Sequence, residues 1–298
     1  MILAAGKGTR LLPLTRELPK PLAWLGDRPQ IDHAIGELAR AGFERVVVNT
    51  HHLAERFDAA WRRSQPIEVV LVHEPEILGT AGGVANAAAA LGAGDVLVWN
   101  ADIVAKLDVG TFLAAHAASG AAATLVVGPG STSVGAGSVG VDATGRVVRL
   151  RAHRGLGEAR GADYAGIALL SAELRETLCA PGCLVDDAWI PWLERGGAVE
   201  TWALSAPFLD TGTLAEYLAA NLAWLAARGA TSFVAPNAAV EPSVRLDRVV
   251  VASGARARGE GALRRVVVWP GAEAVAPLED AVVTRAGVVP IPLAVAST

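Results

Sequence analysis

The sequence contains little cysteine, little lysine and no long apolar run. Its 298 residues include only two cysteines, Cys179 and Cys183. Two sulfurs in a Cys-x-x-x-Cys spacing, without a nearby pair of His or Cys partners, form a poor metal site. In a chain of this length they indicate free thiols in a reducing compartment, so we expect a cytoplasmic protein. No run of 18 or more apolar residues occurs, which argues against a membrane span or a membrane partner.

Neither sign of charge is in large excess. Lys and Arg number 26 against 30 Asp and Glu, so the formal net charge is −4. Because no long basic run is present, nucleic-acid binding is not expected. The two short basic stretches, residues 146–154 and 256–265, are interpreted as solvated faces. The start lacks a positive segment followed by a long apolar one, so no signal peptide is expected. Abundant alanine beside rare lysine is typical of a GC-rich bacterial coding bias.

Apolar sequence is what the chain has in quantity, since 52% of its residues are hydrophobic. From residue 1 to about 228, runs typical of strands alternate with segments typical of helices. The expected strands are residues 45–49, 67–73, 95–100, 123–127 and 146–150. The expected helices are residues 30–41, 54–63, 82–91, 108–119 and 213–228. This alternation predicts an α/β fold with a doubly wound, mostly parallel, Rossmann-like sheet that binds ligands outside the carboxyl ends of its strands.

The sequence pattern changes after Gly229, where helical periodicity stops and short valine runs recur with glycine turns. Residues 248–255 are echoed by residues 265–272, 17 positions later, and more weakly by residues 281–287. Repeats of this length predict three or four coils of a β-helix. An irregular β-sandwich extension is the alternative. The expected domains are therefore residues 1–228 and 229–298.

The first 22 residues carry most of the functional information. A short apolar strand runs into Gly6-Lys7-Gly8-Thr9-Arg10, and Lys20 follows between two prolines. Glycines let the backbone approach a ligand closely, and successive N–H groups in such a turn form an anion site. Arg10 and Lys20 add a planar fork and a point charge. The segment predicts a site for a nucleoside triphosphate and a second phosphate, rather than an ordinary glycine turn at a sheet edge.

Neither of the two familiar phosphate loops fits this segment. The spacing of Gly6 and Gly8 is not that of a Walker A motif, and Leu11 stands where a dinucleotide fingerprint has its third glycine. The residues instead resemble the signature of the sugar-1-phosphate nucleotidyltransferases, L-A-A-G-x-G-T-R-L-x-P-L-T followed by P-K-P-L. The resemblance covers residues 1–228.

The resemblance implies transfer of a nucleotidyl group from an NTP to a sugar 1-phosphate, with Mg²⁺ as cofactor and the two substrates as partners. It assigns Arg10 and Lys20 to the triphosphate and the transferring group. It assigns the nucleotide itself to the loop formed by Leu3, Ala4, Ala5, Gly6, Lys7, Gly8 and Thr9. Similar tails cap many members of the family, which implies a left-handed β-helix here. Because exposed coils of such a helix often pair, a homodimer is expected.

Two aspartates fit the metal role. Asp102 follows the apolar run Val-Leu-Val-Trp-Asn and matches the family's strand-then-Gly-Asp motif, with Ala101 in place of the glycine. Asp210, in Phe-Leu-Asp-Thr-Gly-Thr, resembles the family's W-x-D-x-G-T segment. The resemblance implies that both carboxylates hold Mg²⁺. The alternative for each is a helix cap, since an aspartate before a turn or helix often caps it.

The base is expected to contact the stretch from Glu74 to Gly83, through Glu74, Gly79 and Thr80. A carboxylate only accepts hydrogen bonds, which suits the N1–H and N2–H₂ groups of guanine. Leu-Gly-Thr-Ala-Gly also resembles mannose-1-phosphate guanylyltransferases. The residues therefore favour GTP and a mannose- or heptose-type sugar. UTP or dTTP stays open, because some uridylyltransferases carry a glutamate here, and so does a simple loop glutamate.

The resemblance is weakest on the sugar side. Gly140 in Val-Gly-Val, and Tyr164 with Gly166 in Tyr-Ala-Gly, resemble the family's two sugar contacts. Between them, the family's F-x-E-K-P is replaced by residues 150–154. Arg151, His153 or Arg154 could supply the charge of the missing lysine, and nothing replaces the glutamate. This departure leaves a catalytically silent, nucleotide-sugar-sensing subunit as the alternative. The retained Arg10, Lys20, Asp102 and Asp210 favour the enzyme.

Overall fold

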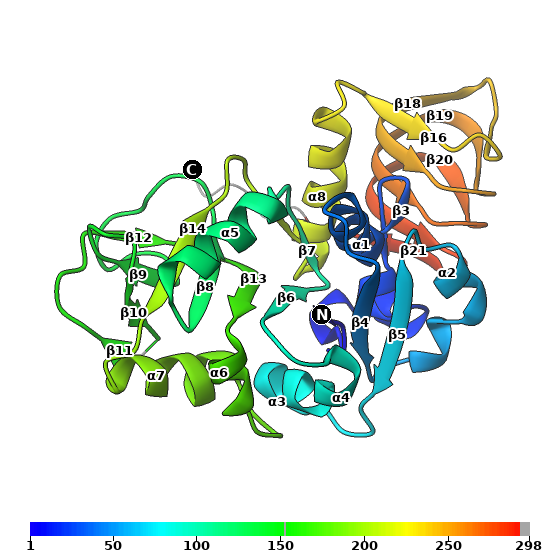
Figure 1. Cartoon of the computed structure of the whole chain (residues 1–298). Coiled ribbons are helices and arrows are strands. Elements are labelled where there is room, and N and C mark those ends of the chain that lie inside the picture. The colour runs from blue at the N-terminus through cyan, green and yellow to red at the C-terminus, as the bar shows by residue number, and fades with distance from the viewer. Residues whose placement is uncertain (152, 293–298) are drawn as a thin grey trace. The chain divides into compact units, whose positions relative to one another are not determined.

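The chain divides into two compact units in the computed structural model, which describes residues 1–151 and 153–292 (Figure 1). One unit comprises Met1–Gly6 and His33–Leu209, and the other comprises Lys7–Asp32 and the chain from Asp210 onward. This partition differs from the expected division at residues 228 and 229. The reason is that helix α8 (Leu214–Ala226) packs on the tail, where the indole Nε1 of Trp269 donates to the Tyr217 hydroxyl at 2.9 Å.

The first unit contains a seven-stranded sheet. Its strands are β1 (Ile2–Leu3), β4 (Arg45–Thr50), β5 (Glu68–His73), β6 (Val96–Asn100), β8 (Ala123–Val127), β13 (Tyr164–Leu170) and β14 (Val199–Ala203). The order is β14-β8-β13-β6-β1-β4-β5. All neighbours are parallel except at β13, which is antiparallel to both β6 and β8. The mostly parallel α/β sheet is confirmed, and its antiparallel strand was not foreseen.

Helices connect most of these strands. They are α1 (Gln30–Arg40), α2 (Ala59–Arg63), α3 (Gly79–Asn86), α4 (Ala88–Leu91), α5 (Val109–Ser119), α6 (Ala172–Glu176) and α7 (Ile190–Glu194), with a π-helical turn at Leu184–Trp189. The expected helix 54–63 is shorter, because Asp58 accepts from the backbone N–H of Trp61 at 2.7 Å and starts α2 there. The expected helix 82–91 begins earlier, at Gly79, and is interrupted at Ala87.

A small antiparallel sheet also belongs to the first unit. Its strands are β9 (Val139–Val141), β10 (Val147–Leu150), β11 (His153–Arg154) and β12 (Arg160–Ala162), in the order β11-β10-β9-β12. The basic stretch 146–154 predicted a solvated face, but Arg149 on β10 is buried. Its side chain is 8% exposed, and its Nε lies 2.9 Å from Oε2 of Glu158. Burial of a charged side chain is tolerated here because an opposite charge pairs with it.

The second unit begins with three short 3-10 turns, Thr9–Leu11, Leu14–Arg16 and Lys20–Leu22, and a hairpin of β2 (Trp24–Leu25) and β3 (Arg28–Pro29). Two further short strands of the chain are β7 (Ile103–Val104) and β15 (Leu209–Asp210). After α8, the tail strands are β16 (Ser232–Val234), β17 (Ala239–Val240), β18 (Val244–Val251), β19 (Arg256–Val268), β20 (Glu273–Thr284) and β21 (Gly287–Pro290). No described helix combines the length and the apolar character needed to cross a membrane.

The tail strands stack in parallel with the spacing that the repeat predicts. Val249 on β18 pairs with Val266 on β19, and Val266 pairs with Ala281 on β20. The offset falls from 17 to 15 residues where the register shifts between Gly259 and Leu263. Parallel stacking of successive segments is compatible with coils of a β-helix, while the left-handed twist stays a prediction. The antiparallel strand β21 pairs with β20 at the end of the stack.

The corners of the stack are held by charge. Arg248, Arg265 and Asp280 occupy equivalent positions, and each has a positive φ of 50–55°. The guanidinium of Arg265 pairs with the carboxylates of Asp280 and Glu279, and this hydrogen bonding holds the pKa of the Asp280 carboxyl below its usual range. The basic stretch 256–265 is therefore partly used in ion pairs inside the tail rather than being only a solvated face.

Candidate functional site

The loop after β1 leaves open space at Gly6. Ala4 and Ala5 are buried, whereas Gly6 and Lys7 are exposed. A Cβ added at Gly6 would meet no protein atom within 4 Å. The packing of the protein therefore does not demand a glycine at this position, and the open space is what close approach of a ligand to the backbone requires.

Gly8 has a different role, because the turn itself requires it. Its φ is +64°, and an added Cβ would lie 2.8 Å from Cγ2 of Thr15 and 3.1 Å from Cβ of Lys20. The Thr15 hydroxyl donates to the Gly8 carbonyl at 3.0 Å. The first 3-10 turn then starts directly after Gly8 and leaves Arg10 exposed.

A buried glutamine joins two of the predicted motifs within the second unit. Gln30 is fully buried, and its Nε2 donates to the backbone carbonyl of Lys20. Its Oε1 accepts from the Thr211 hydroxyl at 2.6 Å. The Pro-Lys-Pro turn and the segment that carries Asp210 are thereby held to one side chain. Sequence reasoning missed Gln30, whose only signal is a polar residue at the start of an apolar helix.

Arg10 and Asp210 approach the same point, which is marked by Gly212. A Cβ there would lie 3.3 Å from Oδ1 of Asp210 and 3.5 Å from Nη1 of Arg10. Helix α8 is capped by Thr213, in a capping box with Glu216, so Asp210 is not its cap. The second unit thus brings the Arg10 and Asp210 side chains together and ties the backbone of the Lys20 turn to the neighbouring Thr211. The capping alternative for Asp210 is wrong.

Asp102 lies at the carboxyl edge of the sheet in the first unit. It is partly exposed in the turn between β6 and β7. The neighbouring Ala101 N–H donates to the carbonyl of Leu3 at 3.0 Å, which ties this turn to the end of β1. The next element after Asp102 is a strand, so the helix-cap alternative is wrong here too.

Glu74 follows β5 at the same edge and points into the protein. It is fully buried. Its Oε1 accepts from Nδ2 of Asn49 at 2.8 Å, and its Oε2 accepts from the backbone N–H of Leu78 at 3.1 Å. The expected base contact would have to share these oxygens. Asn49, the polar residue that ends the Val-Val-Val run of β4, was not singled out from the sequence.

Gly79 and Thr80 are engaged with the turn before α7. Gly79 has a φ of +78°, and a Cβ there would lie 2.4 Å from the carbonyl oxygen of Gly182. The Thr80 hydroxyl accepts from the backbone N–H of Leu184 at 2.9 Å. Both residues have structural reasons for their identity, and their contact with the base stays a prediction.

The predicted sugar residues lie on or beside the small sheet. Side chains of the protein cover Gly140, because an added Cβ would lie 2.6 Å from Cβ of Arg149 and 2.5 Å from Cδ of Glu158. The hydrogen bond from Arg149 lowers the pKa of the Glu158 carboxyl. Glu158 is a carboxylate on this side that sequence reasoning missed, and Arg149 already engages it.

Tyr164 and Gly166 lie on β13. Tyr164 stacks edge-on against Trp189 at 5.5 Å between ring centroids, and burial raises the pKa of its phenol. Gly166 has a φ of +71°, and an added Cβ would be 2.9 Å from Nδ2 of Asn100. Of the candidates for the missing lysine, Arg151 is exposed and pairs with Asp186. The sugar contacts of these residues stay predictions.

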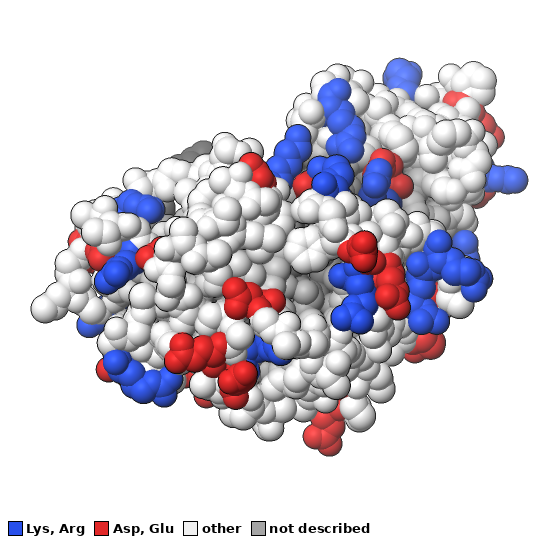
Figure 2. All heavy atoms as spheres, viewed as in Figure 1, with Lys and Arg blue, Asp and Glu red and all other residues white. Residues whose placement is uncertain are grey.

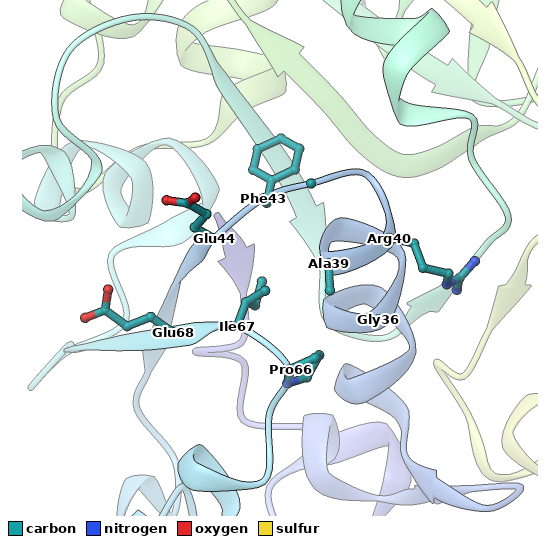
Figure 3. A pocket seen from close by; sticks show the side chains of 9 residues that line it. Gly36, Ala39, Arg40, Phe43, Glu44, Pro66, Ile67 and Glu68 are labelled. Carbon is teal, nitrogen blue, oxygen red and sulfur yellow. The ribbon is translucent and has the colours of Figure 1, made fainter.

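A hollow elsewhere on the first unit does not resemble a substrate site (Figure 3). It lies beside α1, where β4 and β5 begin, and those strand ends are opposite to the ones that carry Asn49 and Glu74. Figure 3 shows Glu44 and Glu68 on one side and Arg40 on the other, so its charged groups do not converge. On the face seen in Figure 2, basic and acidic side chains are interspersed, without an extended basic stripe.

Comparison with known proteins agrees with these features. The nucleotidyl transferase family matches residues 1–151. A mannose-1-phosphate guanylyltransferase of Mycobacterium tuberculosis is 34% identical over 127 residues, which are 42% of this chain and 35% of that protein. An N-acetylmuramate alpha-1-phosphate uridylyltransferase of Caulobacter vibrioides is 38% identical over 109 residues, or 35% of this chain and 45% of that protein. The matches thus span less than half of these relatives.

Solved structures share the fold. HddC from Yersinia pseudotuberculosis superimposes with a TM-score of 0.62 at 22% identity, over 75% of this chain and 97% of that one. Because the family match covers half of the chain and these relatives are named for sugar-1-phosphate substrates, the chain belongs to the nucleotidyl transferase family of sugar-1-phosphate nucleotidyltransferases.

Proposed function

We propose that the protein transfers a nucleotidyl group from an NTP to a sugar 1-phosphate. A phosphate oxygen of the sugar 1-phosphate attacks the α-phosphorus of the NTP, and the bond from that phosphorus to the leaving pyrophosphate breaks. Such a reaction depends mostly on positioning and on neutralising charge. Arg10, Lys20, Asp102 and Asp210 are the residues proposed to do this, and the loop from Leu3 to Thr9 is proposed to hold the nucleotide.

One observation carries the proposal. In the second unit, Gln30 holds the Lys20 turn to Thr211, while Arg10 and Asp210 approach Gly212. The buried amide of Gln30 therefore ties the backbone of the Lys20 turn to the residue that follows Asp210, and Arg10 lies near that same segment. Rigid support of this kind is what positioning of a triphosphate requires, because a misplaced charge loses most of its effect.

Asp102 and Asp210 fit a magnesium ion by the chemistry of their donor atoms. Both offer carboxylate oxygens, and neither caps a helix. Mg²⁺ usually keeps several waters and takes only one or two carboxylates from a protein. Among the described residues, no group of three or more His, Cys, Asp or Glu side chains could hold a metal ion. When bound, the ion would neutralise phosphate charge.

The substrate pair is proposed to be GTP and a mannose- or heptose-type sugar 1-phosphate. The matched mannose-1-phosphate guanylyltransferase supports this choice, as does a structure of HddC complexed with GMP-PN. The matched uridylyltransferase supports UTP instead. The tail is proposed to be a left-handed β-helix whose exposed coils pair in a homodimer.

The test is pyrophosphate release with Mg²⁺, measured for GTP, UTP, dTTP, CTP and ATP against a panel of sugar 1-phosphates. We expect release only when both substrates are present, and loss of release when EDTA removes the metal. The best pair identifies base and sugar together. Release from an NTP alone would contradict the proposed reaction.

The altered sugar side favours a second candidate, a silent subunit that senses nucleotide sugars. The specific observation is that Arg149 engages Glu158 over Gly140, while the family's F-x-E-K-P is missing. No release across the whole panel, together with a thermal shift on adding nucleotide or nucleotide sugar, would establish this candidate and exclude the enzyme.

A further inference from the structure

Four polar groups form a buried chain inside the first unit. The Ala4 N–H donates to Oδ1 of Asn49 at 2.7 Å, and Nδ2 of Asn49 donates to Oε1 of Glu74 at 2.8 Å. At the far end, the Leu78 N–H donates to Oε2 of Glu74 at 3.1 Å. Asn49 is 2% exposed and Glu74 is fully buried. The chain joins the predicted nucleotide loop to the residue before α3.

The direction of these hydrogen bonds follows from the two ends. Both Ala4 and Leu78 present backbone N–H groups, which can only donate. Asn49 must therefore turn its oxygen toward Ala4 and its NH₂ group toward Glu74. Each of the two terminal atoms of side chain 74 then faces a donor, so both must accept a hydrogen bond. A carboxylate does this, whereas a glutamine would place its own NH₂ group against a donor.

Close packing holds this chain in place. A Cβ added at Gly83 of α3 would lie 2.7 Å from Nδ2 of Asn49 and 3.0 Å from Oε1 of Glu74. The same Cβ would lie 3.3 Å from Cδ2 of Leu3. The helix backbone therefore lies directly on the hydrogen-bonded side chains. A buried donor left without an acceptor is costly, so few other side chains are tolerated at positions 49 and 74.

We infer that Asn49 and Glu74 are positioning residues that set the Ala4 N–H relative to the start of α3. The glutamate at position 74 is then required by the donors around it and does not choose the base. The inference rests on the proposed function for what the loop binds. It removes the main sequence argument for guanine, because a glutamate would stand here whichever base is bound.

A reversed pair tests the inference. Glu74→Gln alone places NH₂ against an N–H, and Asn49→Asp alone places two carboxylates together. We expect each single variant to lower the melting temperature by roughly 4–10 °C. The double variant N49D/E74Q satisfies all four groups with the direction of the central bond reversed, so we expect it to recover most of the loss. Glu68→Gln, at an exposed position at the opposite end of β5, is the matched control and should leave the melting temperature and the affinity ratio unchanged.

Two readouts decide the matter. The melting temperature needs no substrate, so additive losses in the double variant would overturn the inference even if the proposed function fails. The second readout is the ratio of GTP to UTP affinity, measured by calorimetry. We expect the double variant to keep the ratio of the parent protein. A tenfold or larger shift of that ratio in the folded double variant would show that Glu74 reads the base.

Discussion

Two glycines of the predicted site have opposite surroundings. At Gly6, in the nucleotide loop, a Cβ would meet nothing within 4 Å. At Gly140, on the sugar side, the same atom would collide with Arg149 and Glu158. One glycine borders open space, while the other makes room for an ion pair of the protein itself. A glycine in a family motif can leave space for a ligand or make room for side chains of the protein itself. Only the surrounding side chains distinguish these two roles.

The largest expected effect tests whether the nucleotide side is catalytic. Asp102→Asn keeps the size of the side chain and removes its charge. We expect turnover to fall by about 10²-fold or more, which corresponds to roughly 3 kcal/mol of transition-state stabilisation. Steady-state pyrophosphate release measures it. Asp247→Asn, at an exposed position in the tail, is the control. Unchanged turnover in D102N would refute the metal assignment.

A change at Gly140 should break the packing of the sugar side. Gly140→Ala inserts a methyl group where Cβ of Arg149 and Cδ of Glu158 already lie within 2.6 Å. Overpacking of this kind typically costs about 1–3 kcal/mol. Urea denaturation measures the free energy of unfolding. Gly36→Ala is the control, because a Cβ at that helical glycine meets nothing within 4 Å. Equal stability of G140A and G36A would remove the contrast between the two glycines.

A change at Gly6 should leave stability unchanged and weaken nucleotide binding. Gly6→Ala adds a methyl group where the protein leaves space, so stability is expected to stay within about 0.5 kcal/mol of the parent. If a nucleotide approaches this backbone, its affinity should fall by about tenfold, or roughly 1.4 kcal/mol. Calorimetric titration with the preferred NTP measures this loss. Full affinity in G6A would mean that the open space is not used by the ligand.

The smallest expected effect lies at His116, away from both glycines. Its Nδ1 lies 2.7 Å from Oγ1 of Thr124, and burial lowers its pKa against the opposing influence of Asp95 and Glu200. The folded state then favours the neutral ring, while the unfolded chain takes up a proton near pH 6.5. The stability that this provides is present above about pH 6.5 and is lost as the pH falls toward the folded pKa.

Denaturation between pH 8 and pH 5 measures this dependence. The variant His116→Gln removes the titrating group, so its stability should vary less across this interval than that of the parent protein. An identical slope in both proteins would show that His116 does not contribute.

Much of the fold could be predicted from local patterns. The expected strand 123–127 coincides with β8, and the expected helix 108–119 coincides with α5 and its Asp108 cap. The repeat of 17 residues predicted the pairing of Val249 with Val266. In each case the signal lies within one segment or recurs at a fixed spacing, so no distant contact has to be known.

Other features were beyond the sequence because they depend on distant residues. β13 is antiparallel, since the chain crosses the small sheet before it returns between β8 and β6. Arg149 is buried because Glu158, nine residues later, neutralises it. The basic run 146–154 does not itself indicate that Glu158 will pair with Arg149.

Local sequence patterns were enough to predict the alternating sheet, the repeat of the tail and the glycine-rich motif at residues 6–20, whose phosphate binding stays a prediction. These follow from local hydrophobic period, from glycine and from charge. The tertiary structure alone decided what each polar side chain does. Asn49 meets Glu74 across 25 residues, and Gln30 meets Thr211 across 181. A buried donor must find an acceptor wherever the fold provides one, so its partner, and hence its role, is set only when the chain has folded.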